Sequence, residues 1–218
     1  MNTKRILEIG GVVSGVVLIA FGVVAIVLGV NARSTVNDSL KQEAIVGSSD
    51  MTPSAIKTEA QQAKLPASIS LPTCNVAGKQ VANGTEARCF AQYMRIHTLE
   101  ATGGLTYAQM GRYQAANGKG SDGIGGTNDE AAAVTDTKTG QPVANGRRDI
   151  WVTETALTTA LNVSYMASNL ALFGIVVGFA LLLSGIGFLI LALVVLGRGA
   201  TEAKEATVAK VTVTPVTG

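Results

Sequence analysis

The single histidine and the two cysteines set the first limits on the chemistry of this chain. Its 218 residues include one histidine, His97, and two cysteines, Cys74 and Cys89. One imidazole excludes every intrachain site that needs two, including the iron site built from two histidines and one carboxylate. Two thiols and one imidazole form no four-ligand zinc site unless distant carboxylates join them. We therefore predict no metal site and no cofactor.

Cys74 and Cys89 are expected to form a disulfide. An even pair of cysteines in a segment outside the cytoplasm is typical of a disulfide, the alternatives being free or metal-binding thiols. Closing a loop of about 15 residues contributes roughly 3 kcal/mol in the chain-entropy treatment. The bond would tether the irregular stretch 75–85 to the start of the following helix.

His97 is predicted to pack partly into the core, because a helical spacing places it on one face with Phe90 and Met94. No G-x-S-x-G, Walker or dinucleotide-binding motif accompanies it, so no catalytic residue is predicted. The alternative is an extracytoplasmic ligand-binding sensor or enzyme. It requires four side chains to converge on a pocket: His97, Glu100, Tyr107 and Arg112.

Two further clusters carry polar or anchoring side chains. The glycine-rich stretch 118–130 holds calcium-type oxygen ligands without EF-hand spacing, so we expect a mobile loop there. Arg147, Arg148 and Trp151 precede the last long apolar segment, and arginine and tryptophan are frequent interface anchors. These three are the predicted partner-binding residues. The alternative is that Trp151 packs in the core while both arginines are solvated.

Two long apolar segments flank the part of the chain that carries these polar residues. Neither the stretch 9–30 nor the stretch 169–196 contains a charged residue. At about 1.5 Å per residue, about 22 residues span about 33 Å, enough for the hydrocarbon core of a bilayer. We predict two transmembrane helices at these positions. A cleaved signal peptide is the alternative for the first, although its apolar run exceeds the usual length of about 7–15 residues.

The basic residues near the membrane ends predict the orientation. They are Lys4 and Arg5 before the first segment, and Arg198 and Lys204 after the second. Basic residues favour the cytoplasmic side, so residues 1–8 and 197–218 are expected in the cytoplasm, the latter as a disordered tail. Residues 31–168 then form an extracytoplasmic domain of a multi-pass plasma-membrane protein. Arg33, just outside the first segment, argues weakly for the opposite orientation.

Small residues recur every seven positions in both apolar segments. They are Gly15, Gly22 and Gly29 in the first, and Ala171, Gly178, Gly185 and Ala192 in the second. A seven-residue repeat keeps one stripe facing a partner helix, and small residues let two backbones approach closely. The stripes predict an antiparallel hairpin of the two helices. The alternative is that glycine is simply common in membrane helices.

The domain between them is predicted to be helical, with one stapling disulfide. After a helical stalk, Thr52 and Pro53 are typical of a helix start, and helices are expected at 54–64 and 86–101. A capping-box pattern at Thr106 predicts another helix ending at 117–118, followed by a short hairpin around residues 138–140. One continuous helix is expected from about Asp149 to Leu196. A heptad-like seam is predicted along its outer part, through Ala156, Ala160, Val163, Ala167 and Leu170.

Two segments resemble an uncharacterised family of small two-pass membrane proteins from actinobacteria. They are 96–108, reading IHTLEATGGLTYA, and 149–157, reading DIWVTETAL. The resemblance covers nearly the whole chain except the tail. Some members are labelled as aromatic ring-opening dioxygenases, a chemistry whose iron ligands one histidine does not supply. What the resemblance implies is therefore the two-pass architecture and the compartment.

The balance of charge limits the partners. The chain has a formal net charge of +2, and residues 31–168 carry 12 basic and 12 acidic residues. Nucleic-acid-binding modules are usually basic, so no nucleic acid is expected. The predicted partners are membrane lipids and another membrane or envelope protein. The predicted function is that of a non-enzymatic, membrane-anchored interaction domain, one form of which is an accessory subunit of a larger membrane complex such as a respiratory assembly.

Overall fold

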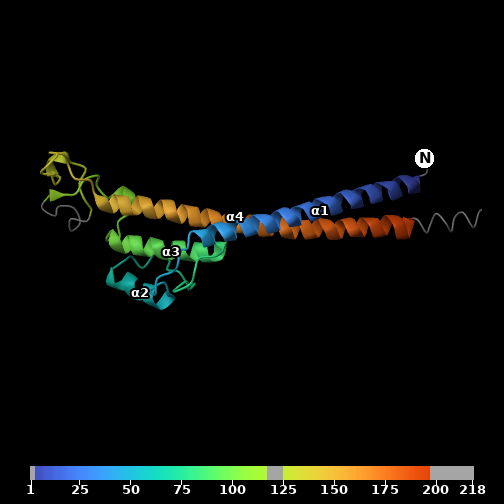
Figure 1. The fold of residues 1–218 in the computed structure, drawn as a ribbon, viewed down its shortest axis with the longest axis horizontal. Helices are drawn as coiled ribbons and strands as arrows, with labels where there is room; N and C mark the ends of the chain where they lie inside the picture. Colours follow the sequence, from blue (N-terminus) through green and yellow to red (C-terminus); the bar gives the residue numbers. More distant parts are fainter. Residues whose placement is uncertain (1–2, 117–124, 197–218) are drawn as a thin grey trace, which may run out of the picture. The chain divides into compact units, whose positions relative to one another are not determined.

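The structure is a computed structural model that describes residues 3–116 and 125–196. Four α-helices dominate these residues (Figure 1): α1 (Thr3–Gln42), α2 (Pro53–Gln62), α3 (Gly84–Ala101) and α4 (Gly146–Ile190), which continues as a π-helical turn, Leu191–Leu196. Within the described ranges there are isolated β-bridges but no named strand. The prediction of a mainly helical chain is confirmed. The expected disordered tail, Arg198, Lys204 and most of the glycine-rich stretch lie outside the described residues.

The chain divides into two compact units. One comprises Met1–Arg33 with Leu170–Gly218, and the other comprises Ser34–Asn169. We call them the apolar-helix unit and the central unit. Helices α1 and α4 each contribute one end to each unit.

Two helices of the described chain are long and apolar enough to cross a membrane by length and composition. They run from Arg5 to Gln42 and from Gly146 to Val194, and only 11% and 17% of their most apolar windows are buried. Large side chains such as Phe21 and Leu183, each 65% exposed, cover their surface. A core helix of a soluble protein buries most of its apolar surface, so these helices leave an unusually large apolar area uncovered.

The core of the central unit forms around α3. Ala87, Tyr93 and Ile96 on this helix are 0–2% exposed, and they pack in one cluster with Ile56 of α2 and Leu161 of α4. Burial of one large apolar side chain stabilises the folded state by roughly 1.5–3 kcal/mol. The entropy cost of ordering that side chain is subtracted from this gain. The Tyr93 hydroxyl donates to the Cys74 carbonyl at 2.6 Å, which satisfies the polar end of the buried ring. Burial raises the pKa of Tyr93 above its ordinary value.

Local signals determine where α2 and α3 begin and end. The Thr52 hydroxyl accepts from the Ala55 amide at 3.2 Å, with Pro53 at the first helical position of α2. The Asn83 side chain accepts from the Glu86 amide at 3.0 Å and starts α3 two residues before the predicted position. Gly103 follows α3 with φ of 63°, a conformation that glycine adopts without strain, and ends it as predicted.

The predicted helix from Thr106 to residues 117–118 is wrong where the structure describes it. The Gln109 side chain does accept from the Thr106 amide at 2.8 Å, but the box closes only the 3-10 turn η1 (Tyr107–Gln109). The following backbone is extended, and Tyr113 forms antiparallel bridges to Thr127 and Ala144. These distant backbone partners replace the hydrogen bonds that a helix would have made.

The short hairpin around residues 138–140 is present. Thr135 and Pro142 form an antiparallel bridge, and the Val143 amide donates to the Val134 carbonyl at 2.8 Å. A further 3-10 turn, η4 (Glu130–Ala132), precedes this hairpin. The buried side chain of Asn145 donates to the Gly111 carbonyl at 3.1 Å. This hydrogen bond connects the backbone at Gly111 to the start of α4.

Most of the seam predicted along the outer part of α4 does not pack within the central unit, although Ala167 is partly buried. Ala156, Ala160 and Val163 are exposed, whereas Glu154, Thr158 and Leu161 are buried. The reason is that α3 covers the opposite side of α4, where Leu161 joins the core cluster. An apolar face of α4 is therefore left uncovered by the central unit.

Candidate functional site

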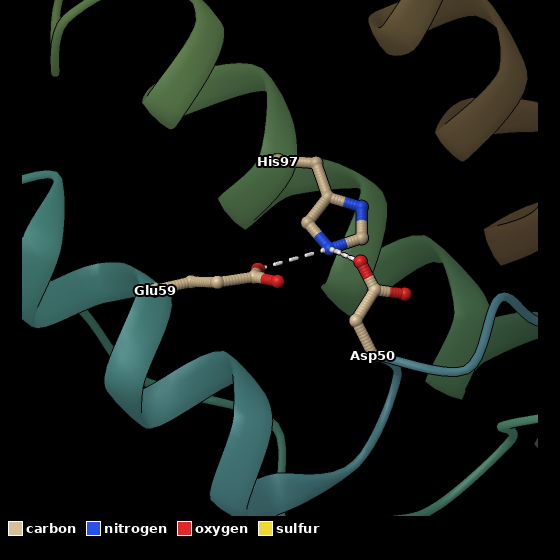
Figure 2. A group of neighbouring side chains, drawn as sticks. All are labelled: Asp50, Glu59 and His97. Atoms are coloured by element: carbon tan, nitrogen blue, oxygen red, sulfur yellow. Dashed lines mark ion pairs between the residues drawn. The ribbon is translucent and has the colours of Figure 1, made fainter.

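Three ionisable side chains from three separate elements meet on the central unit (Figure 2). Asp50 lies in the loop between α1 and α2, Glu59 lies on α2, and His97 lies on α3. His97 Nε2 stands 3.3 Å from Glu59 Oε2 and 3.5 Å from Asp50 Oδ2. One ligand atom from each residue lies within 4.8 Å of the other two. We call this group the carboxylate–imidazole cluster.

Buried neighbours hold each member of the cluster in place. Met51, next to Asp50, is 3% exposed, and its amide donates to the Ser48 carbonyl at 3.1 Å. Ile56, one turn before Glu59, is fully buried and fixes the rotation of α2 about its axis. Ile96, beside His97, is 2% exposed and fixes α3 in the same way. The three side chains thus stand on a rigid frame.

The electrostatics of the cluster favour a positive group at its centre. Burial raises the pKa of Glu59 above its ordinary value, and the charges of Asp50 and Glu100 raise it further, while His97 opposes them. A hydrogen bond from the Ser48 hydroxyl lowers the pKa of Asp50, against the effect of burial. Two carboxylates side by side disfavour each other's ionised form unless a cation stands between them.

His97 is partly buried on α3, as expected, but it also has contacts that the expectation did not include. The ring does lie on α3 with the partly buried Met94, but its Nε2 atom faces two carboxylates. No local pattern indicates this contact, since Asp50 and Glu59 precede His97 by 47 and 38 residues. Asp50 and Glu59 are, however, distant carboxylates of the kind that a metal site with a single imidazole requires.

The four residues of the alternative ligand pocket have different neighbours. His97 belongs to the carboxylate–imidazole cluster, and Glu100 influences Glu59 through its charge. Tyr107 instead contacts Arg148, whose guanidinium carbon lies 4.0 Å from the centre of the Tyr107 ring. The guanidinium carbon of Arg112 lies 5.3 Å from the centre of the Tyr113 ring. The structure brings Glu100 near the cluster and places Tyr107 and Arg112 in other contacts.

Arg147, Arg148 and Trp151 lie together at the start of α4 and contact α3 and η1. Arg147 donates to the Ala101 carbonyl at the end of α3, and Arg148 stacks on Tyr107. Trp151 is only half-buried, with the Arg95 guanidinium 4.6 Å from its ring centre. The alternative of a core Trp151 with two solvated arginines does not hold in full, because Trp151 is only partly buried and both arginines have intramolecular partners. Partner binding by these three residues stays a prediction.

An apolar groove runs beside these aromatic rings. Its volume is about 540 Å³, and it is lined by Tyr107, Trp151, Val152, Thr155, Ala156 and Thr159. The uncovered face of α4 continues from it through Val163 and Met166, which are 51% and 64% exposed. We call this continuous surface the α4 face.

The small residues of the seven-residue stripes meet in the apolar-helix unit. A Cβ atom on Gly15, Gly22 or Gly29 of α1 would lie 2.7–2.8 Å from a carbonyl oxygen of α4, closer than real Cβ atoms come. The α4 residues that supply these oxygens are Gly185, Gly178 and Ala171, and a Cβ on Gly11 would meet Ala192 at 2.9 Å. In contrast, Gly10, Gly174 and Gly187 face nothing within 4 Å. The close contacts therefore follow the stripes and not glycine in general.

The disulfide predicted between Cys74 and Cys89 is confirmed. The two residues are bonded, with their Cα atoms 6.1 Å apart, and no described cysteine is free. Cys89 lies on α3 and is 4% exposed, so the bond fastens the loop before α3 to the core.

The described residues define a class: a mainly helical protein with two candidate membrane helices and a disulfide-stapled central unit. No known protein family matches the chain, and no curated protein or solved structure is similar to it.

Proposed function

We propose that this chain is a non-enzymatic, membrane-anchored docking protein. In this proposal α1 and α4 cross the plasma membrane as an antiparallel hairpin and display the central unit outside the cytoplasm. The observation that carries the docking role is the α4 face, an apolar surface of the central unit that the described fold leaves uncovered. One form of this role is that of an accessory subunit in a larger membrane complex.

Two features support the hairpin anchor. The most apolar windows of α1 and α4 are almost entirely exposed, as hydrocarbon-facing helices are. Their small residues face each other at backbone contact, and such contacts drive helix association where lipid replaces water.

The disulfide supports the placement of the central unit outside the cytoplasm. Structural disulfides persist in oxidising compartments and are rare in the reducing cytoplasm. The basic residues near the membrane ends independently favour the same orientation, with the two termini in the cytoplasm.

The spacing of the α4 face favours a helical partner. Val152, Ala156, Thr159, Val163 and Met166 follow one another at intervals of four, three, four and three residues. This is the spacing of the contact positions in paired helices, which pack side chains of one helix between those of the other. We therefore take the partner to be an apolar helix of another membrane or envelope protein, seated along this face and against Trp151.

A photocrosslinking amino acid at Val163 tests the docking proposal in membranes of the native host. We expect one adduct of defined mass, which is lost when Met166→Asp is added. The matched control is the same crosslinker at Thr153, which is exposed on α4 but off the face. Equal adducts at both positions, or none at Val163, contradict the proposal, and an adduct of twice the chain mass identifies the partner as a second copy.

Gly22→Leu is expected to separate the two apolar helices. The added side chain starts 2.7 Å from the Gly178 carbonyl oxygen, so the backbones must move apart. Overpacking of this kind costs roughly 1–3 kcal/mol. Dipolar coupling between spin labels on cysteines at the exposed positions Leu28 and Leu172, measured in detergent micelles, should weaken and broaden.

Gly174→Leu is the matched control for this variant. It adds the same side chain to an apolar helix at a position with nothing within 4 Å. The coupling should stay as in the parent chain. If both leucine variants behave alike, the glycine stripes do not hold the helices together and the hairpin is wrong.

A further inference from the structure

The carboxylate–imidazole cluster has the dimensions of a metal site. Ligand atoms about 2.0–2.1 Å from a tetrahedral zinc ion stand roughly 3.3–3.4 Å from one another. His97 Nε2 lies 3.3 Å from Glu59 Oε2 and 3.5 Å from Asp50 Oδ2. Small side-chain rotations suffice to bring all three atoms, now within 4.8 Å of one another, onto one ion.

Two facing atoms of the cluster form an ion pair but have no hydrogen-bond partner. His97 Nε2 and Glu59 Oε2 each expose less than 1 Å² to solvent, and neither has a hydrogen-bond partner. Leaving a buried polar atom unpaired costs roughly 1–3 kcal/mol, more if it is charged. Two such atoms only 3.3 Å apart can be satisfied together by one cation that contacts both.

The charge of the cluster matches a divalent cation. With both carboxylates ionised and a neutral imidazole, Asp50, Glu59 and His97 carry a charge of −2. Glu100 adds further negative charge near Glu59. A protonated His97 would neutralise only half of the pair, whereas one divalent ion neutralises both carboxylates.

We propose that Asp50, Glu59 and His97 bind a first-row divalent cation, with Zn²⁺ as the preferred ion. Imidazole favours zinc and its neighbours in the transition series, whereas calcium needs six to eight oxygen ligands and magnesium keeps several waters. Three protein ligands leave one tetrahedral position open to water. The side chains of His97 and Glu59 are each 24% exposed, whereas their facing atoms Nε2 and Oε2 are buried, so the site lies just below the surface of the central unit.

The bound ion also links parts of the chain that are distant in sequence. It joins the loop before α2, α2 itself and α3 through one residue from each. Because binding requires the folded arrangement, the ion stabilises the central unit by mass action. This inference does not depend on docking, and its test uses no partner protein.

Calorimetric titration of the full chain with ZnCl₂ tests the proposal. The protein is purified in mild detergent, stripped with a chelator and freed of any affinity tag. We expect one zinc ion per chain with a Kd below about 10 μM, weaker than full four-ligand sites. Zinc should also raise the midpoint of thermal unfolding, and magnesium at the same concentration should do neither.

His97→Gln, Glu59→Gln and Asp50→Asn should each weaken zinc binding at least roughly 10-fold, since even loss of an outer partner of a ligand has effects of 10–100-fold. Glu100→Gln is the matched control: it removes the same kind of charge from α3 without removing a ligand, and its Kd should stay within about threefold. Retention of the oxidised disulfide and of a cooperative unfolding transition shows that each variant is folded.

Three results overturn the site. They are no zinc uptake by the parent chain, unchanged affinity in His97→Gln, or equal losses in Glu100→Gln and Glu59→Gln. The first means that zinc does not hold the cluster together.

Discussion

Arg95→Met is expected to destabilise the central unit by about 3 kcal/mol or more. Arg95 on α3 lies 3.2 Å from a carboxylate oxygen of Glu154, whose side chain is only 1% exposed. The other carboxylate oxygen, Oε1, is buried and has no hydrogen-bond partner. Removing one member of a buried pair costs roughly 3–5 kcal/mol, because an uncompensated charge stays behind. We use the lower end because the Arg95 side chain is 40% exposed.

The double variant Arg95→Met/Glu154→Leu should recover most of this loss. Apolar side chains of similar size can replace a buried ion pair at little cost, or with a gain. The measurement is urea unfolding of the full chain in detergent, followed through the fluorescence of Trp151, the only tryptophan. Trp151 stacks against Arg95, so part of the single-variant loss, about 0.5–1 kcal/mol, comes from that contact and is not recovered.

Arg88→Met is the matched control for Arg95→Met. Arg88 also lies on α3 and also stacks on an aromatic ring, that of Tyr165, at 5.1 Å. Its hydrogen bond goes to the neutral Asn162 side chain at 3.2 Å in an exposed position. The expected loss is below about 1 kcal/mol. Equal losses in the two arginine variants would show that the buried carboxylate of Glu154 is not what makes Arg95 important.

Removal of the disulfide is expected to cost about 3 kcal/mol, the figure for a closed loop of about 15 residues. Cys74 and Cys89 are separated by 15 positions, and Cys89 is almost fully buried in the core cluster. In the Cys74→Ala/Cys89→Ala variant, the loop keeps the Tyr93 hydrogen bond to the carbonyl of residue 74 and the buried side chains of Val76 and Val81. The urea midpoint of the Trp151 transition should fall accordingly.

Reduction of the parent chain provides an independent measurement of the same quantity. A thiol reductant should lower the midpoint of the parent to that of the alanine variant and leave the variant unchanged. Full reduction is verified by labelling two thiols per chain. A fully reduced parent chain with an unchanged midpoint would falsify the view that the disulfide stabilises the central unit.

Features that depend on local residue patterns were predictable from the sequence. The uncharged runs 9–30 and 169–196 predicted two long apolar helices because length and hydropathy are properties of a continuous segment. Thr52, Pro53 and Gly103 marked helix ends because their backbone chemistry acts within a few residues. The cysteine pair predicted the disulfide because an even pair in a segment expected outside the cytoplasm is typical of one.

Other expectations failed because competing partners lay far along the chain. The capping box at Thr106 formed, yet no helix followed it, since Thr127 and Ala144 supplied Tyr113 with bridges that no local rule anticipates. The heptad-like spacing at Ala156 and Val163 described a real apolar stripe. Which stripe of α4 faces the core depended on where α3 packs.

The sequence by itself determined the helical class of this protein, its two apolar helices, its disulfide and the limit of one imidazole. Only the tertiary structure decided what that imidazole meets. Asp50 and Glu59 come to His97 because Met51, Ile56 and Ile96 are buried and set the position of a loop and two helices. Burial acts between residues that are distant in sequence, so the carboxylate–imidazole cluster exists only once the core has formed.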